Sequence, residues 1–138
     1  MPRRLLLSLR PKFAQLILAG EKTVELRRVR PKIGHGDIMF IYATAPIQAV
    51  VAHCRVDRVV SDSQDSVWSL VAHRAAIDPI AFKRYYAGLG IAHAIFFFEV
   101  VPLAEPISLD ALRRGWPEFT PPQSYRYVPS DKTTVLGL

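Results

Sequence analysis

The segment "AGEKTVELRR" (residues 19–28) contains the expected end of a helix and the expected start of a strand. Its glycine follows an apolar stretch with helical spacing, where a left-handed glycine commonly ends a helix. The residues after the lysine alternate between polar and apolar, as in a strand with one buried face. Val24 and Leu26 should then face the core, so Glu25 and Arg27 would share a polar surface or cleft.

The segments on either side extend this pattern. "PKFAQLILAG" predicts a short helix with proline at its first position and Gly20 just past its end. "LLLSLR" (5–10) before it and "IMFIYA" (38–43) after it predict strands, the second of them buried on both faces. "IQAVVAHCRVDRVV" (47–60) predicts a long strand. Its two faces would carry Val50, Ala52, Cys54 and Val56 on one side and His53, Arg55 and Asp57 on the other.

The second half of the chain predicts three more short helices and one strong strand. "SDSQDSVWSLVAHRAA" has N-cap residues followed by an apolar stripe that includes Val67, Leu70 and Val71. Asp78 precedes the helix "PIAFKRYYAG", and "SLDALRRG" predicts another. "IAHAIFFFEVVPL" (91–103) predicts a strand, and "WPEFTPPQSYRYV" is broken by prolines and extended.

Strands outnumber helices, and no regular alternation of strand and helix appears. The sequence therefore predicts an α+β fold, a small barrel-like domain in which a mostly antiparallel sheet curls around a core with helices at its ends. No internal repeat, low-complexity tract or linker divides the chain, so we expect residues 1–138 to form one domain.

The composition is that of a globular protein: of the 138 residues, 50% are apolar and 22% are charged. The longest apolar runs are too short to cross a bilayer, so we expect no membrane association through a helix. "MPRRLLLSLRPKF" has no small-residue cleavage site, so we expect no signal peptide. A lone Cys54 cannot form an internal disulfide, which favours the cytoplasm as the protein's location.

The net charge of +6 lies at one end of the chain. Residues 1–32 contain nine Lys or Arg and two Glu, a net charge of +7, and the other 106 residues carry a net charge of −1. A localised positive field favours a polyanionic partner such as a nucleic acid or nucleotide. A basic surface that only keeps the protein in solution explains the charge equally well.

Metal and cofactor sites are not predicted. The four histidines are widely spaced, and no Cys-x-x-Cys or His-x-x-x-His pair exists. His53 and Cys54 are neighbours on a predicted strand and would point to opposite faces. The chain also has no glycine-rich phosphate loop and no nucleophile elbow.

The charged residues of the opening segment could form an anion site. A carboxylate at Glu25 can orient Lys22 and Arg27 and keep both charged, and it can still accept a hydrogen bond from a base or sugar. Arg27 could clamp a phosphate through two parallel hydrogen bonds. The alternative is a solvated strand with an ion pair of little energetic consequence.

"GEKTVELR" reads Gly20-x-Lys22-x-x-Glu25-x-Arg27, and it resembles the hallmark G-x-K-x-x-E-x-R of the ASCH domain, a branch of the PUA-like superfamily. The resemblance continues through residues 8–52, from the first strand to the segment "IYATAP". The C-terminal "PPQSYRYV" is similar to a segment of one small bacterial subgroup. The resemblance thus covers most of the chain.

This resemblance implies a pseudo-barrel of mostly antiparallel strands and a module that binds or processes RNA, with the hallmark residues lining a cleft. Our first hypothesis is that the chain binds single-stranded RNA or a nucleotide in a basic cleft. Docking to another protein ranks last, because no helix-turn-helix partner is present in the sequence. The predicted nucleic-acid-binding residues are Lys22, Glu25, Arg27, Arg28, Tyr42, Ser124 and Arg126.

The alternative is a hydrolase that acts on RNA or modified nucleosides, with Lys22, Tyr42 and Ser124 as catalytic residues. In the similar subgroup, ribonuclease activity is attributed to a tyrosine, a lysine six residues later and a serine near the C-terminus. Tyr42 and Ser124 look equivalent, but Gln48 occupies the lysine position and carries no charge. Another branch hydrolyses acylated cytidine with a threonine three residues after the hallmark lysine, where this chain has Glu25.

The aromatic residues are assigned mainly to packing. Tyr125 and Tyr127 lie on the same face of an extended segment, and we expect both to close the barrel against the core. Flat rings next to cations could instead stack on unpaired bases. Three more aromatic residues have helical spacing and are expected to pack in the core or against helices: Trp68, Tyr85 and Tyr86.

Overall fold

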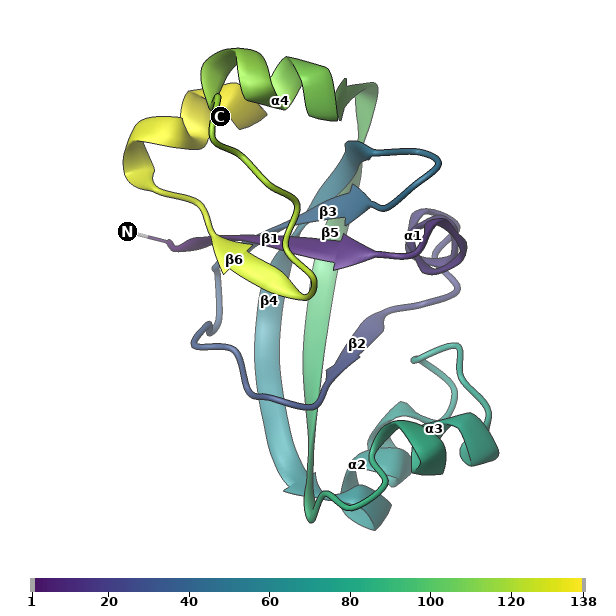
Figure 1. Cartoon of the computed structure of the whole chain (residues 1–138). Coiled ribbons are helices and arrows are strands. Elements are labelled where there is room, and N and C mark those ends of the chain that lie inside the picture. The colour runs from purple at the N-terminus through teal and green to yellow at the C-terminus, as the bar shows by residue number, and fades with distance from the viewer. Residues whose placement is uncertain (1, 138) are drawn as a thin grey trace.

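The computed structural model describes residues 2–137, which form one six-stranded mixed sheet with helices at its edges and ends (Figure 1). The strand order is β2-β5-β4-β3-β1-β6. The strands are β1 (Arg4–Leu9), β2 (Val24–Arg27), β3 (Ile38–Ala43), β4 (Ala49–Ser63), β5 (Ile91–Ser108) and β6 (Tyr125–Tyr127). The helices are α1 (Pro11–Leu18), α2 (Gln64–Val71), α3 (Pro79–Tyr85), α4 (Leu109–Gly115) and the 3-10 helix η1 (Ser130–Leu136).

The predicted α+β class and the mostly antiparallel sheet are confirmed. Only β1 and β3 run parallel, and the other neighbouring strands within residues 2–137 pair antiparallel. β4 and β5 form a long ladder, from the pair Ala49–Ser108 to the pair Ser63–Ile91. In Figure 1 these two strands run the height of the molecule, with α4 at one end and α2 and α3 at the other. The sheet curls as half of a barrel.

The strand β3 is buried on both faces, as its unbroken apolar run predicts. Met39 and Ile41 pack in one cluster with the apolar side chains of β1 and α1. Phe40 and Tyr42 pack on the other face, with side chains of α4 and η1. One prediction about its neighbour β4 was wrong: Val50 packs with the second cluster, because a bulge shifts the β4 register between Val50 and Ala52.

A third cluster lies between the sheet and the pair α2 and α3. Val67 and Val71 are fully buried there, whereas Leu70 is 47% exposed, so only two of the three residues predicted for this stripe face the core. The predicted N-caps are present: Ser63 accepts a hydrogen bond from the Ser66 amide, and Asp78 accepts one from the Ala81 amide.

The two tyrosines of β6 behave differently. Tyr125 packs against the first cluster, as predicted. Tyr127 is 39% exposed, so the prediction that it packs in the core was wrong. Its hydroxyl accepts from the Lys32 amide at 3.0 Å and donates to the Lys32 carbonyl at 3.1 Å. Tyr127 thus ties the loop after β2 to the last strand instead of filling the interior.

Within residues 2–137, none of the helices combines the length and the apolar character that a membrane span requires. The helices of this fold are seven or eight residues long.

Cys54 should be unreactive in the folded protein. It is fully buried on β4, and burial raises the pKa of its thiol to about 12, so almost no thiolate exists at neutral pH. We expect a maleimide to label the native protein only as fast as the chain unfolds, and to label the guanidinium-denatured chain at once. Mass spectrometry of timed samples measures both rates. Equal rates for the two states would contradict the buried position of Cys54.

Candidate functional site

The hallmark segment starts at the end of α1, where the chain reverses direction. Gly20 has a φ of +77°, in the left-handed region that favours glycine. The amides of Glu21 and Lys22 both donate to the Leu16 carbonyl, which closes the last turn of the helix. This turn places Lys22 beside the start of β2, a position that strand alternation could not predict.

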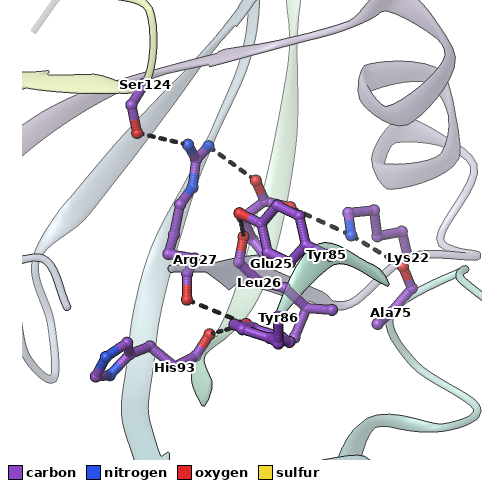
Figure 2. A network of polar contacts seen from close by, with 9 residues as sticks. All are labelled: Lys22, Glu25, Leu26, Arg27, Ala75, Tyr85, Tyr86, His93 and Ser124. Atoms are coloured by element: carbon purple, nitrogen blue, oxygen red, sulfur yellow. Dashed lines mark hydrogen bonds and ion pairs between the residues drawn. The ribbon is translucent and has the colours of Figure 1, made fainter. Parts of the chain in front are cut away.

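Lys22, Glu25 and Arg27 form one buried ion network (Figure 2). Lys22 Nζ lies 3.2 Å from Glu25 Oε1, and Arg27 Nη2 donates to Glu25 Oε2 at 2.8 Å. The exposed fractions of the three residues are 4%, 7% and 8%. The alternative of a solvated ion pair on an open strand is therefore excluded.

Each end of the network is held by a distant part of the chain. Lys22 Nζ donates to the Ala75 carbonyl at 2.9 Å, in the connection between α2 and α3. Arg27 Nη1 donates to Ser124 Oγ at 2.8 Å, just before β6. Figure 2 shows the line of contacts from Ser124 through Arg27 and Glu25 to Lys22 and Ala75. The site therefore joins three segments that lie far apart in the sequence.

The network lies beside two connected hollows. The larger hollow has a volume of about 630 Å³, within the range of small-molecule sites, and the smaller hollow has about 310 Å³. Five cations and one carboxylate line the larger hollow, so its charge is strongly positive. These residues are Arg10, Lys22, Arg27, Arg28, Arg84 and Glu25.

Apolar and aromatic groups line most of the rest of the larger hollow, together with the polar residues Ser8, Thr44 and Gln123. Phe13 from α1 and Tyr85 from α3 contribute rings, and Lys22 Nζ lies 5.6 Å from the centre of the Phe13 ring. The guanidinium of Arg28 lies over the Tyr85 ring at 4.6 Å. Burial raises the pKa of Tyr85, so its hydroxyl stays neutral at physiological pH. The hollow thus combines flat apolar walls with positive charge.

The structure brings together five of the seven residues that we predicted to bind nucleic acid: Lys22, Glu25, Arg27, Arg28 and Ser124. Ser124 lines the smaller hollow, and Arg28 lines both.

Tyr42 and Arg126 line neither hollow, contrary to our prediction. Tyr42 points to the opposite face of β3, with its ring 6.4 Å from Phe119, and burial raises the pKa of its hydroxyl. The guanidinium of Arg126 lies over the Trp116 ring at 4.5 Å. Both residues therefore contribute to packing around α4. Gln48 is exposed and also lines neither hollow.

Sequence reasoning missed several residues of the site. Tyr85 was assigned to packing, and Phe13 lay in a predicted helix to which no part in the site was given. Arg10 and Arg84 were counted only as charge. No spacing rule links these positions to the hallmark, because the tertiary fold brings α1 and α3 to the cleft.

The chemistry open to the lining residues is limited. No histidine lines either hollow within the described chain, and both oxygens of the only lining carboxylate, Glu25, are already paired. Among residues 2–137, no group of three or more His, Cys, Asp or Glu side chains is placed to hold a metal. The arrangement suits the binding of an anion better than proton transfer.

Tyr86 fixes the end of β2 next to the site. Its hydroxyl lies within hydrogen-bond distance of the Arg27 and His93 carbonyls, at 3.1 and 3.0 Å, and these two residues pair across β2 and β5. The hydroxyl has one hydrogen, so it donates to one of the two carbonyls at a time. Tyr86→Phe removes this donor, so it should lower the free energy of unfolding by about 1–2 kcal/mol. Urea denaturation measures this change. Tyr125→Phe, whose hydroxyl makes no hydrogen bond within the described chain, is the control, and equal losses in the two variants would contradict this role.

Comparison with known proteins finds relatives that match nearly the whole chain. A curated relative from Zymomonas mobilis subsp. mobilis, named an ASCH domain-containing ribonuclease, is 32% identical over 130 residues and covers 94% of this chain and 87% of the relative. A crystal structure of ASCH from Zymomonas mobilis is 30% identical, with a TM-score of 0.91 over 97% of this chain and 93% of that one. A serine-to-alanine variant of ZmASCH is 29% identical, with a TM-score of 0.92 over 99% of this chain and 97% of that one.

The model of the family described as "ASCH domain" matches residues 7–100, which include the whole of the hallmark segment. Together with the relative that is 32% identical over nearly the full length, this match shows that the chain belongs to the ASCH domain family.

Proposed function

We propose that residues 1–138 form one ASCH domain that binds single-stranded RNA or a nucleotide in the larger hollow. The observation that carries this proposal is the composition of that hollow, which has five cations, one carboxylate and two aromatic rings. Cations bind phosphate, and flat rings are the surfaces on which unpaired bases stack. The naming of a relative as a ribonuclease also favours an RNA ligand. The cytoplasm, where the lone buried cysteine stays reduced, is the expected location.

The ion network has a defined part in this proposal. Glu25 keeps Lys22 and Arg27 charged and aligned although all three are buried. Arg27 Nε is buried and makes no hydrogen bond within the described chain. A buried donor without a partner is costly for folding, and such costs are commonly retained at binding sites. Arg10, Arg28 and Arg84 are exposed and would contact the phosphates directly.

A salt titration with labelled single-stranded RNA tests the proposal. With about three phosphate contacts, affinity should fall about tenfold or more between roughly 50 and 200 mM salt. The double variant Arg10→Ala/Arg84→Ala should bind more weakly and show a shallower salt dependence, by about one unit of slope per arginine.

The matched control is Lys83→Ala/Arg114→Ala, which removes the same charge from positions that line neither hollow. Single-stranded RNA that does not bind, or equal losses in the two double variants, would end the proposal.

Cleavage of RNA in the same cleft is a second candidate, favoured by the name of the relative. The lining residues offer electrostatic stabilisation of a pentavalent phosphate by Arg27 and Lys22, but no unpaired carboxylate or histidine to move a proton. Incubation with RNA and with acylated nucleosides, followed by mass spectrometry, separates the two functions. Products that disappear in Arg27→Met would establish a hydrolase, whereas intact substrate together with binding would leave a binding module.

A further inference from the structure

The larger and smaller hollows adjoin each other. Four residues line both of them: Arg27, Arg28, Tyr85 and Gln123. The larger hollow extends from this junction toward Phe13 and Lys22, and the smaller one extends toward Val29 and Ser124. A ligand that fills only the larger hollow leaves the smaller one, of about 310 Å³, empty.

Arg28 stands at the junction with its phosphate-binding edge free. Its Nε donates to the Tyr85 carbonyl at 2.7 Å, and its guanidinium lies over the Tyr85 ring, so the side chain is fixed in place. Its two terminal nitrogens make no hydrogen bond to any residue of the described chain. Both terminal nitrogens of Arg27, the other cation shared by the hollows, already donate to Glu25 and Ser124. The fork of Arg28 is therefore the one better placed for a phosphate.

The two hollows differ in the groups that they offer. The larger one has rings and aliphatic side chains along its walls, which suit the face of a base. The smaller one offers the exposed side chain of Val29 and the polar groups of Gln123 and Ser124, which suit a second nucleoside with its sugar hydroxyls. Positive charge is concentrated at and beyond the junction on the side of the larger hollow.

We infer that the ligand is an internal step of a single-stranded chain. One nucleoside lies in the larger hollow, its neighbour lies in the smaller one, and the phosphate that links them lies on the fork of Arg28. This inference rests on the proposed function and narrows it, because a free mononucleotide or a chain end would leave the smaller hollow empty. A mononucleotide site would instead place its phosphate on Arg10 or Arg84, inside the larger hollow.

Matched ligands test the second nucleoside. A dinucleoside monophosphate is compared with the nucleoside 3′-methyl phosphate and the nucleoside 5′-methyl phosphate, each of which keeps one base and a singly charged phosphodiester. Calorimetry or tyrosine fluorescence measures the three affinities. We expect the dinucleotide to bind about tenfold more tightly than either methyl ester, because only it fills both hollows.

Substitutions at Arg28 test the position of the phosphate. Arg28→Ala should weaken binding of the dinucleotide about tenfold, and Arg28→Lys should recover only part of the loss, since lysine keeps the charge without the fork. Arg114→Ala, at an exposed arginine on α4, is the control and should bind as the unchanged protein does.

The outcomes separate this inference from the proposed function. Equal affinities for the dinucleotide and the methyl esters, or an unchanged affinity in Arg28→Ala, would overturn the inference while RNA binding stands. A nucleoside monophosphate that binds more tightly than the dinucleotide would also overturn it and indicate a chain-end site. Failure of every ligand, together with failure of longer RNA, would refute the proposed function itself.

Discussion

Glu25→Ala is expected to lower the free energy of unfolding by about 3–5 kcal/mol, the largest stability change that we predict for this chain. Lys22 and Arg27 are almost fully buried, and Glu25 is the only acidic group with which either forms an ion pair within residues 2–137. Removing it leaves two like charges in the interior without a counter-charge. Each charge then loses the interaction that offset its removal from water.

Urea denaturation at neutral pH measures this effect. Glu21→Ala is the control, because Glu21 lies four residues earlier, is exposed and forms no ion pair in the described chain. We expect that control to change stability by less than about 0.5 kcal/mol. A loss below about 1 kcal/mol in Glu25→Ala would show that the network is more hydrated than its burial implies.

The same network shows what the sequence could and could not predict. Alternation along β2 places Glu25 and Arg27 on one face and Val24 and Leu26 on the other, and the structure agrees, with both apolar residues in the cluster under α2 and α3. Side chains alternate between the two faces of any strand because of the local backbone geometry, so this part of the prediction does not depend on the tertiary fold. It does not reveal the depth of burial, which depends on what covers the face.

The segments that bury Glu25 and Arg27 lie far from β2 in the sequence, and local sequence patterns do not predict where they pack. Ala75 accepts a hydrogen bond from Lys22 across 53 positions, and Ser124 accepts one from Arg27 across 97. α2 and α3 connect β4 to β5 at one end of their ladder, and Tyr85 of α3 lines the larger hollow. A helix of seven residues has no sequence feature that marks such a position.

Tyr42 illustrates a different limit. Its place at the end of β3 and its face of the strand follow from the sequence, but which face meets the cleft depends on strand pairing. β1 pairs parallel with β3, and the even-numbered residues of β3 meet α4 and η1. The resemblance placed Tyr42 near the site, and the packing around Phe119 places its ring elsewhere.

The second large effect is a separation of folding from binding in the triple variant Lys22→Met/Glu25→Leu/Arg27→Met. Buried ion networks can often be replaced by apolar side chains of similar volume with little loss, or with a gain, of stability. We therefore expect the triple variant to be within about 1 kcal/mol of the unchanged protein or more stable, in contrast to Glu25→Ala. Because the three residues share contacts, their single effects are not additive.

The affinity of the same variant for single-stranded RNA should fall by about thirtyfold or more, because it lacks two cations of the larger hollow and the hydrogen bond from Arg27 to Ser124. Urea denaturation and RNA titration on one preparation measure both properties. Unchanged RNA affinity in a stable triple variant would show that the network serves folding alone and that the ligand, if any, is held by the exposed arginines. Combined loss of stability and binding would show instead that the charges are required to assemble the cleft.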